Sequence, residues 1–452
     1  MKGHLKSCIF FSIAYLSVSA YALTYSGGSG TISNPYLIST AADVNSIGLD
    51  PNDWNKYFKL TADVNMSAYS GSQYKIIGNT SKPFTGTFDG NGHTISNLTY
   101  TNPIFNYYYI GMFGYTSYAT IKNLGLENVN INGHCTGAGA LIGYQDNGTD
   151  SNCFSTGSVS VFSTFSGISA TYAGGLVGST NKGTIKSCFS ECSVNSVFYI
   201  SRTSFAGGLV GNQYNSSILN CYSSGSVYAS SNSSYAGGFL GIMSGDSTAV
   251  LRNCYSTGQP STAGSSQYKG GLLGMFSGTG IIRGCFWDKN TSGLNNGIGE
   301  GSSSYVVGKT TTEMQTLSTF TNAGWDFIGE TSNGTNDYWQ MPVNDYPRLS
   351  YEVVFAGDLN NDGIVDFADL YIFMSQWLCE ELNYDLYSAD NLHIVNFLDW
   401  DIFAKNWDGD FIELSNFAYE WLEYDAYNAD IAGDDDFVNF LDFAAFAENW
   451  ME

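Results

Sequence analysis

Near the C-terminus, oxygen-bearing side chains recur at the spacing of a calcium-binding loop. Within GDLNNDGIVDFADLYIFMSQWL (357–378), positions 1, 3, 5, 9 and 12 of the loop are Asp358, Asn360, Asp362, Asp366 and Asp369. Gly363 stands at position 6, where the chain must turn sharply, and Ile364 at position 7 would offer its backbone carbonyl. Ca²⁺ takes about six to eight oxygen ligands, and this spacing wraps them around one ion. The pattern predicts a Ca²⁺ site, with a solvated acidic turn as the alternative.

Two later stretches follow this pattern less completely. ADNLHIVNFLD is two residues short between Asp390 and Asp399, and Leu392-His393 stand where an acid and a glycine belong. ADIAGDDDFVNFLD is one residue too long between Asp430 and Asp442. We therefore expect weaker ligand sets in these loops. They are Asp390, Asn396 and Asp399 in the second loop, and Asp430, Asp434, Asn439 and Asp442 in the third.

The loops alternate with segments that share the pattern F-x-[D/E]-x-x-x-F-x-x-x-W, at 367–378, 397–408, 411–422 and 440–451. Phe and Trp at these spacings share one helical face, so we expect short helices that pack their aromatic side chains into a bundle. The aromatics then form a core rather than a sugar-stacking platform. Residues 351–452 carry 24 acids and one lysine, which is −23 of the total charge of −24. This acidity argues against nucleic acid as a partner.

The opposite end of the chain predicts export. Lys2 and Lys6 precede the apolar stretch CIFFSIAYLSVSA, and Ala20-Tyr21-Ala22 has the form of a cleavage site. We expect residues 1–22 to be a signal peptide cleaved near Ala22, and the protein to be secreted or held at the cell surface. The apolar run is too short for a transmembrane anchor, and we expect no membrane span in the mature chain.

The middle of the chain repeats itself. Glycine-rich phrases such as GGLVG (174–178 and 207–211) and GGFLG (237–241) return at intervals of 29 to 35 residues, which is typical of a solenoid. Alternating apolar residues indicate strands rather than helices. We therefore expect a right-handed parallel β-helix over 111–300. Residues 23–110 would form an N-terminal cap and the first coils, 301–350 a closing cap and linker, and 351–452 the acidic helical domain.

Register within the repeat predicts which side chains face inward and where the coils bend. In ATIKNLGLENVNI (119–131) the inward positions are Ile121, Leu124, Leu126, Val129 and Ile131. Asn123, Asn220 and Asn253 share one register position, with Ser187 and Gly284 as variants, and Asn tolerates the left-handed backbone of a bend. The paired glycines indicate a corner or a close backbone approach.

Cysteine replaces Leu124 in the later coils, at positions 153, 188, 221, 254 and 285. We interpret these side chains as stacked, buried thiols. Disulfides between neighbouring coils and a metal site are the alternatives, since export would permit a disulfide.

Both flanks of the repeat show local signals. At 26–48 we expect a strand and then a helix capped by Thr40 and Asp43, covering the open end of the stack. PFTGTFDGNGHTISNLTY (83–100) predicts strand, turn and strand. MQTLSTFTNAGWDF and YWQMPVNDYPRL are expected in the closing cap.

These motifs resemble two known families. The GGLVG…NCYSSGSV phrases are similar to the GLUG repeats of large secreted bacterial proteins, and the flanking sequences of residues 26–349 resemble that family too. This resemblance implies a β-helical surface or adhesive module without a general enzymatic activity. The acidic segment resembles a dockerin, which implies Ca²⁺-dependent docking onto a cohesin-like partner. Many dockerins have hydroxyl residues at loop positions 10 and 11, where this chain has Phe367-Ala368 and Phe397-Leu398.

The coils offer little for catalysis. Polysaccharide-cleaving enzymes need paired carboxylates or Ca²⁺ with a base, but the acids between 135 and 300 share no register, Asp288 being the one possible exception. Our hypothesis is a non-catalytic binding or adhesive protein, in polysaccharide-associated complexes, whose partners are a cohesin-like protein or the cell envelope, and a glycan. The alternatives are a polysaccharide lyase or glycoside hydrolase on a β-helix, and a purely structural surface component.

Overall fold

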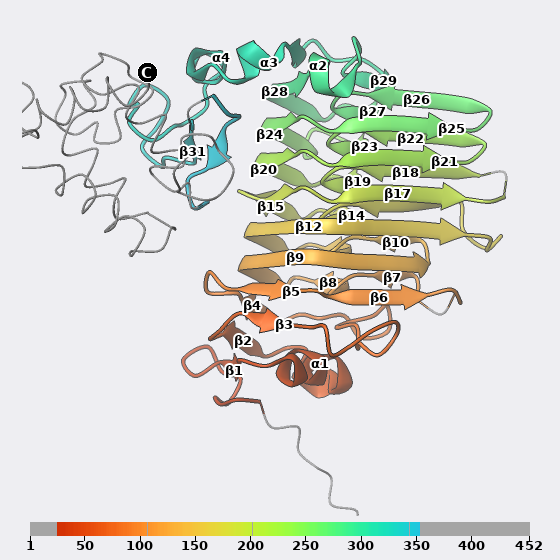
Figure 1. The fold of residues 1–452 in the computed structure, drawn as a ribbon, viewed down its shortest axis with the longest axis vertical. Helices are drawn as coiled ribbons and strands as arrows, with labels where there is room; N and C mark the ends of the chain where they lie inside the picture. Colours follow the sequence, from red (N-terminus) through yellow and green to blue (C-terminus); the bar gives the residue numbers. More distant parts are fainter. Residues whose placement is uncertain (1–24, 106, 201, 343, 353–452) are drawn as a thin grey trace, which may run out of the picture.

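The computed structural model describes residues 25–352, apart from residues 106, 201 and 343. The chain winds into a parallel β-solenoid, in which strands from successive coils stack into three sheets (Figure 1). One sheet receives a single strand from each of seven coils. The predicted mainly-β fold with a parallel solenoid is confirmed. The predicted signal peptide and residues 353–452 of the predicted acidic domain lie outside the described residues.

The largest sheet has 17 strands and forms the longest side of each coil. Its strands are β1 (Tyr36–Ile38), β2 (Tyr57–Leu60), β3 (Val64–Asn65), β4 (Thr87–Asp89), β5 (Thr94–Ser96), β6 (Thr99–Asn102), β9 (Thr120–His134), β12 (Thr149–Ser163), β15 (Thr184–Lys186), β16 (Phe189–Ser190), β17 (Ser193–Phe198), β20 (Ser217–Ser223), β21 (Ser226–Ser230), β24 (Val250–Ser256), β25 (Gln259–Ala263), β28 (Ile281–Asp288) and β30 (Val306–Lys309).

Two narrower sheets close each coil. The six-stranded sheet contains β7 (Tyr109–Ile110), β10 (Gly137–Ala138), β13 (Ala170–Gly174), β18 (Thr203–Gly207), β22 (Ser233–Gly237) and β26 (Ser266–Gly270). The seven-stranded sheet contains β8 (Phe113–Ser117), β11 (Ile142–Asp146), β14 (Val177–Asn181), β19 (Val210–Tyr214), β23 (Leu240–Gly245), β27 (Leu273–Gly278) and β29 (Ile298–Glu300).

The predicted register holds. Cys153 on β12 lies opposite Leu124 on β9, and Cys254 pairs with both Cys221 and Cys285. The five ladder cysteines are buried and free, which agrees with stacked thiols rather than disulfides. Burial raises the pKa of the Cys188 and Cys254 thiols well above the usual value, so these side chains stay protonated and pack as small apolar groups.

Left-handed residues mark the bend in every central coil. Asn123, Asn220 and Asn253 have φ angles of 54°, 51° and 52°, and the variants Ser187 and Gly284 have 50° and 57°. Asn152, at φ 52°, belongs to the same column. Glycine acts differently at the next corner. A Cβ on Gly207 would lie 2.1 Å from the carbonyl oxygen of Val210, so this position requires close backbone approach.

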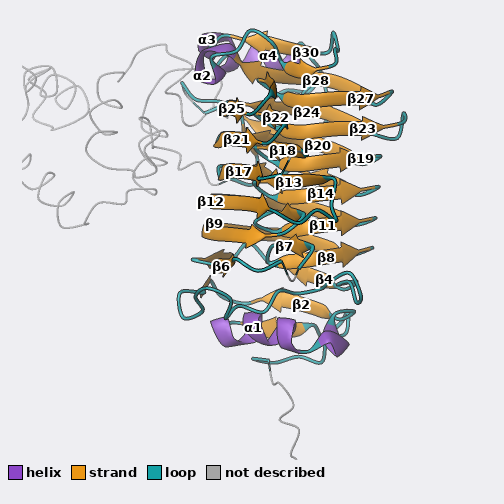
Figure 2. Cartoon of the chain, turned by 90° about the vertical axis from the view of Figure 1, so that its right-hand side faces the viewer, coloured by secondary structure: helices purple, strands orange, loops and turns teal. Residues whose placement is uncertain are grey.

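The N-terminal end of the stack is covered by α1 (Ala41–Leu49), which a 3₁₀ turn (Pro51–Asp53) follows (Figure 2). The backbone N–H of Asp43 donates to Thr40 Oγ1 (3.1 Å), and the Asp43 carboxylate accepts from the Thr40 N–H (3.0 Å), as the sequence predicts. The predicted strand–turn–strand at 83–100 also forms. Its strands β4 and β5 both pair with β9 in parallel, so the turn is a corner of one coil.

The C-terminal end carries α2 (Lys289–Ser292), α3 (Thr311–Met314) and α4 (Leu317–Thr321) (Figure 1). The segment YWQMPVNDYPRL was expected in this closing cap, and its Trp339 does share a buried cluster with Met314 and Phe320 of the cap helices. Its strands β31 (Trp339–Gln340) and β32 (Arg348–Leu349) fold back along the flank of the solenoid. There they bury a column of outward-facing aromatic rings that would otherwise be exposed to solvent. We call residues 338–352 the strap.

Candidate functional site

A column of aromatic rings follows the Cys ladder on the outer face of the largest sheet. Phe154, Phe189, Tyr222 and Tyr255 stack with centroid separations of 4.9, 4.7 and 5.0 Å and interplanar angles of 3° to 7°. Each ring is the residue directly after a ladder cysteine, so it points outward when the thiol points inward. The stack spacing equals the spacing between coils. We call these four residues the aromatic ladder.

The strap and the closing helices bury most of the aromatic ladder. Trp339 lies 6.5 Å from Tyr222 and 6.1 Å from Tyr255, measured between ring centroids. The Tyr255 hydroxyl donates to the carbonyl oxygen of Pro347 at 2.7 Å. Only Phe154, the first rung, is left half-buried. The buried cluster under this cover consists of Phe189, Tyr222, Tyr255, Phe286, Met314, Phe320, Trp325, Phe327, Trp339 and Leu349.

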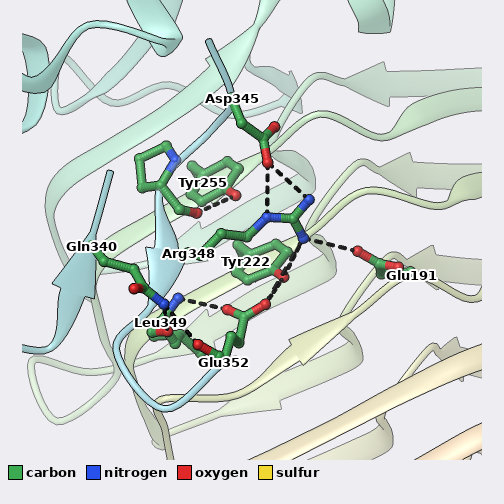
Figure 3. A network of polar contacts seen from close by, with 9 residues as sticks. Glu191, Tyr222, Tyr255, Gln340, Asp345, Arg348, Leu349 and Glu352 are labelled. Carbon is green, nitrogen blue, oxygen red and sulfur yellow. Dashed lines mark hydrogen bonds and ion pairs between the residues drawn. The ribbon is translucent and has the colours of Figure 1, made fainter. Parts of the chain in front are cut away.

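A polar network fastens the strap to the ladder (Figure 3). Arg348 donates from Nε to Asp345 (3.0 Å) and from Nη1 to the Tyr222 hydroxyl (3.0 Å), and it also contacts Glu191 at 3.4 Å. The Tyr222 hydroxyl donates in turn to Glu352 Oε2 at 2.7 Å, while the Leu349 N–H donates to Glu352 Oε1. These contacts join two neighbouring coils, through Glu191 and Tyr222, to the end of the described chain.

Glu352 is the group in this network that titrates near neutral pH. Burial raises the pKa of its carboxyl to about 7, against the opposing effects of the Leu349 N–H, the Tyr222 hydroxyl and Arg348. Burial also raises the pKa of the Tyr222 hydroxyl well above its usual value, so Tyr222 remains a donor.

A pocket of about 530 Å³ opens where the aromatic ladder emerges from under the strap. The cover above it comes from the strap, and the floor comes from the bends of the two coils below. Its lining combines aromatic rings, amides, carboxylates and glycines: Gly92, Asn123, Leu124, Gly125, Glu127, Asn152, Phe154, Phe189, Tyr351 and Glu352.

Gly125 creates room for the pocket. It pairs in register with Phe154, so it occupies the position where the next aromatic ring of the ladder would stand. A Cβ on Gly125 would lie 2.4 Å from the tip of the Phe154 ring, which leans across this glycine. The ladder therefore ends at Phe154, because no aromatic side chain stands at position 125.

The amides beside the pocket are held in a fixed orientation. Asn152 Nδ2 donates to Asn123 Oδ1 at 3.0 Å, and Asn123 Nδ2 donates to Asp89 Oδ1 at 3.1 Å. These hydrogen bonds run along the column of bend residues, whose backbone is left-handed. The predicted bend asparagines thus contribute to a candidate site, a role that the sequence analysis did not assign to them.

Two carboxylates, Glu127 and Glu352, line this pocket together. The sequence reasoning missed the pair, because the acids that it compared lay between 135 and 300. A signal was nevertheless present: an aromatic residue follows each cysteine at an outward position, which indicates a covered or ligand-binding face.

The other acids of the coils have structural partners. Asp288 is buried; its Oδ1 accepts from the Asn290 N–H at 2.7 Å, and its Oδ2 accepts from the hydroxyls of Thr311 and Tyr346 at the same distance. It therefore caps α2 and ties the strap to the last coil. Within the described ranges, no group of three or more His, Cys, Asp or Glu side chains could hold a metal ion.

A second set of stacked rings lies where the two narrower sheets meet. Tyr172, Phe205, Tyr235 and Tyr268 stack with centroid separations of 5.5, 4.8 and 4.8 Å. The Tyr235 hydroxyl donates to Glu300 at 2.7 Å. These rings pack against Ile242 and Met275, and no pocket among those described here includes them.

The predicted Ca²⁺ ligands lie outside the described residues, so their prediction stays a prediction. This applies to all three loops. None of the helices in residues 25–352 is long and apolar enough to cross a membrane.

Comparison with known proteins supports the repeat. Residues 206–228 match the GLUG motif. The chain is 33% identical to Halomucin of Haloquadratum walsbyi across 32% of its own length, and 34% identical to a protein named as a Gly-rich membrane protein of Evansella cellulosilytica across 30%. These matches span 2% and 16% of the respective relatives, so they concern a segment of each.

A solved structure shares the fold. A Bacteroides ovatus protein described as an immunoglobulin A1 protease superimposes with a TM-score of 0.53 and 20% identity. The superposition covers 73% of this chain and 96% of that one. At this identity the likeness concerns the fold alone. The chain thus carries a GLUG motif on a parallel β-solenoid, with a pocket at the end of its aromatic ladder.

Proposed function

We propose that this protein is an exported, non-catalytic binding protein of the cell surface that recognises glycans through its β-solenoid. In this account the solenoid has the right-handed winding usual for parallel crossovers. The acidic domain at 351–452 acts as a Ca²⁺-dependent connector to a cohesin-like protein or another envelope partner.

The pocket beside Phe154 is the observation that carries the glycan-binding proposal. Ligand sites combine apolar and aromatic walls with a few convergent polar groups, and this pocket has both. Its rigid setting also suits binding, because Asn123 and Asn152 are fixed by their own hydrogen bonds and Phe154 by its stack on Phe189.

Export is supported by the sequence of residues 1–22 and by the name of one relative. The Evansella cellulosilytica relative is named as a membrane protein. That name accords with a place at the cell surface.

The connector rests on the loop at 358–369. Asp358, Asn360, Asp362, Asp366 and Asp369 supply side-chain oxygens at calcium-loop spacing, with Ile364 supplying its carbonyl. The following Phe and Trp pattern supplies a small helical core against which such a loop can be held.

A second candidate function is cleavage of a polysaccharide. Glu127 and Glu352 line the same pocket, and this favours cleavage because glycoside hydrolysis uses two carboxyl groups. A general acid works best with a pKa near the working pH, and burial raises the pKa of Glu352 to about 7. Against this role, Glu352 is already engaged by the Tyr222 hydroxyl and the Leu349 N–H.

The mature chain, 23–452, should be applied to a glycan array with Ca²⁺ present, and the bound glycans then incubated with the protein and analysed for products. Binding without turnover supports our proposal. Release of reducing ends or unsaturated sugars establishes the enzyme instead. No binding to any glycan would leave the structural-component hypothesis. A pull-down from the producing cell's envelope, with and without Ca²⁺, tests the connector separately.

A further inference from the structure

We propose that the pocket binds one pyranose ring of an uncharged glycan, packed against Phe154 at the open end of the aromatic ladder. This inference rests on the proposed glycan-binding function and assigns it a place and a ligand class. The polar groups that would receive the ring's hydroxyls are Glu127, Asn152 and Tyr351.

The first step is the shape of the site. The rungs of the ladder are flat rings about one coil apart, and the position below Phe154 is Gly125. Phe154 is half-buried, while Phe189 and Tyr222 above it are buried. A ligand with one flat apolar face can therefore pack against the half-buried ring of Phe154, where Gly92 and Gly125 lie on the pocket lining.

The second step is that hydrogen-bond acceptors without a partner in the described residues also line the pocket. Hydrogen bonds run in a chain from the amide of Asn152 through that of Asn123 to the carboxylate of Asp89. In the coil that follows Asn152, the bend residue is Ser187. Asn152 Oδ1 accepts no hydrogen bond from any residue that the structure describes. With the carboxylate of Glu127, the lining offers mostly free acceptors. Sugar hydroxyls are the donors that such a lining can satisfy.

The third step is an unsatisfied hydroxyl. Tyr351 lines the pocket, and its hydroxyl oxygen is shielded from solvent without a hydrogen-bond partner in residues 25–352. Leaving a buried polar atom unpaired is unfavourable, so a ligand hydroxyl that pairs with it would gain affinity. This group is independent of the aromatic stack and of the amide chain.

The charge of the lining selects among sugars. Glu127 lies on the pocket, and Asp89 closes the amide chain beside it. Glu352 adds less negative charge, because Arg348 lies 3.8 Å from its carboxylate. Lys122 pairs with Asp89 at 3.0 Å and so does not provide a free cation there. A carboxylated or sulfated sugar would meet like charge, which costs binding energy, and an uncharged ring would not.

The decisive variant is Tyr351→Phe in the mature chain. It removes only the unpartnered oxygen, so the melting temperature should be unchanged or slightly higher. The probe is the sugar that binds the wild type best, chosen from methyl glucoside, galactoside, mannoside and xyloside and their β-1,4-linked disaccharides. Its binding to Tyr351→Phe should be about 5- to 10-fold weaker than to the wild type. Saturation-transfer NMR titrations measure this. Tyr338→Phe, on an exposed side chain of the same strap, is the matched control and should change nothing.

A second pair of variants tests the amide. Asn152→Gly keeps the left-handed backbone and deletes the free acceptor, so it should weaken the same probe several-fold. Asn147→Gly, also left-handed but distant from the pocket lining, should not. Glucuronic acid should bind more weakly than glucose.

The outcomes separate the two proposals. Glycan binding by the wild type that Tyr351→Phe and Asn152→Gly leave intact overturns the pocket assignment and leaves the proposed function standing. A wild type that binds no glycan overturns both. Preference for an acidic sugar, or saturation of the pocket by an aromatic peptide such as Gly-Tyr-Gly in place of every sugar, overturns the ligand class.

Discussion

The guanidinium of Arg348 lies 3.0 Å from the hydroxyl oxygen of Tyr222, although the two residues are separated by 126 positions in the chain. Arg348 belongs to the strap and Tyr222 to the aromatic ladder. The same hydroxyl contacts Glu352, which lines the pocket. The contact therefore links the strap that covers the ladder with the wall of the candidate site.

Arg348→Leu should loosen the strap. The change leaves Asp345 and Glu352 without their cation in a partly buried setting, which costs about 3 kcal/mol for a broken pair of this kind. Limited proteolysis should then cut within 338–352 while the coils stay intact. Arg252→Leu, on an exposed side chain, is the control. Equal proteolytic resistance of both variants would contradict the role given to Arg348.

Stability should fall as the pH rises from about 5 to 8, in part through Glu352. Its pKa in the folded protein is about 7, above the ordinary value of 4.5, so the folded state binds this proton more tightly. Glu352 therefore contributes at most about 3 kcal/mol to the free energy of unfolding. This contribution is complete below the pKa of the unfolded state and is lost as the pH rises through 7. Urea unfolding at a series of pH values measures it.

Glu352→Gln removes this titration, so its unfolding free energy should depend less on pH between 5 and 8 than that of the wild type. Glu330→Gln provides a control outside the Arg348 network. A pH dependence of Glu352→Gln as steep as that of the wild type would show that Glu352 does not titrate in this range.

Asp150→Asn should stabilise the protein at alkaline pH. Asp150 is buried in register with Ile121 and Ile185, and it accepts from Gln145 Nε2 at 2.8 Å. Burial raises the pKa of its carboxyl well above the ordinary value, so its ionisation at high pH opposes folding. The amide keeps an acceptor for Gln145 without a charge.

The stabilising effect of Asp150→Asn should therefore grow between pH 6 and 9 and be small at pH 5. Thermal unfolding of the two proteins in parallel measures the difference. A variant that is less stable than the wild type at every pH would contradict a protonated Asp150 in the core.

Ca²⁺ should stabilise the acidic domain of the mature chain. If Ca²⁺ at 1 mM exceeds its dissociation constant about 100-fold, the gain is about 2.7 kcal/mol. Asp358→Ala and Asp369→Ala should abolish most of it, whereas Glu420→Ala, outside the predicted loops, should not. Calorimetric titration that detects no binding at millimolar Ca²⁺ would refute the first loop as a calcium site.

Much of the solenoid could be predicted from the sequence, because its rules act locally and repeat. A bend needs a residue that tolerates positive φ. Asn123, Asn220 and Asn253 indicated the position of the bend in their three coils. Inward positions alternate with outward ones, so the burial of Leu124 fixed the burial of the cysteines in its register.

The candidate site was not predictable in the same way, because it depends on a contact between distant parts of the chain. Glu127 and Glu352 line one pocket only because the strap turns back along the flank of the solenoid. The outward aromatics after each cysteine indicated that something covers this face. They did not indicate which segment does so, or that the cover stops short of Phe154.

The most direct test of the central claim is a depletion assay in which the mature chain is mixed with insoluble, uncharged polysaccharide and Ca²⁺. Protein lost from solution and reducing ends released are measured in the same tube. Our account predicts that protein is depleted, that soluble neutral glycoside restores it, and that reducing ends stay at background. Sustained release of reducing ends, or no depletion on any polysaccharide, would contradict it.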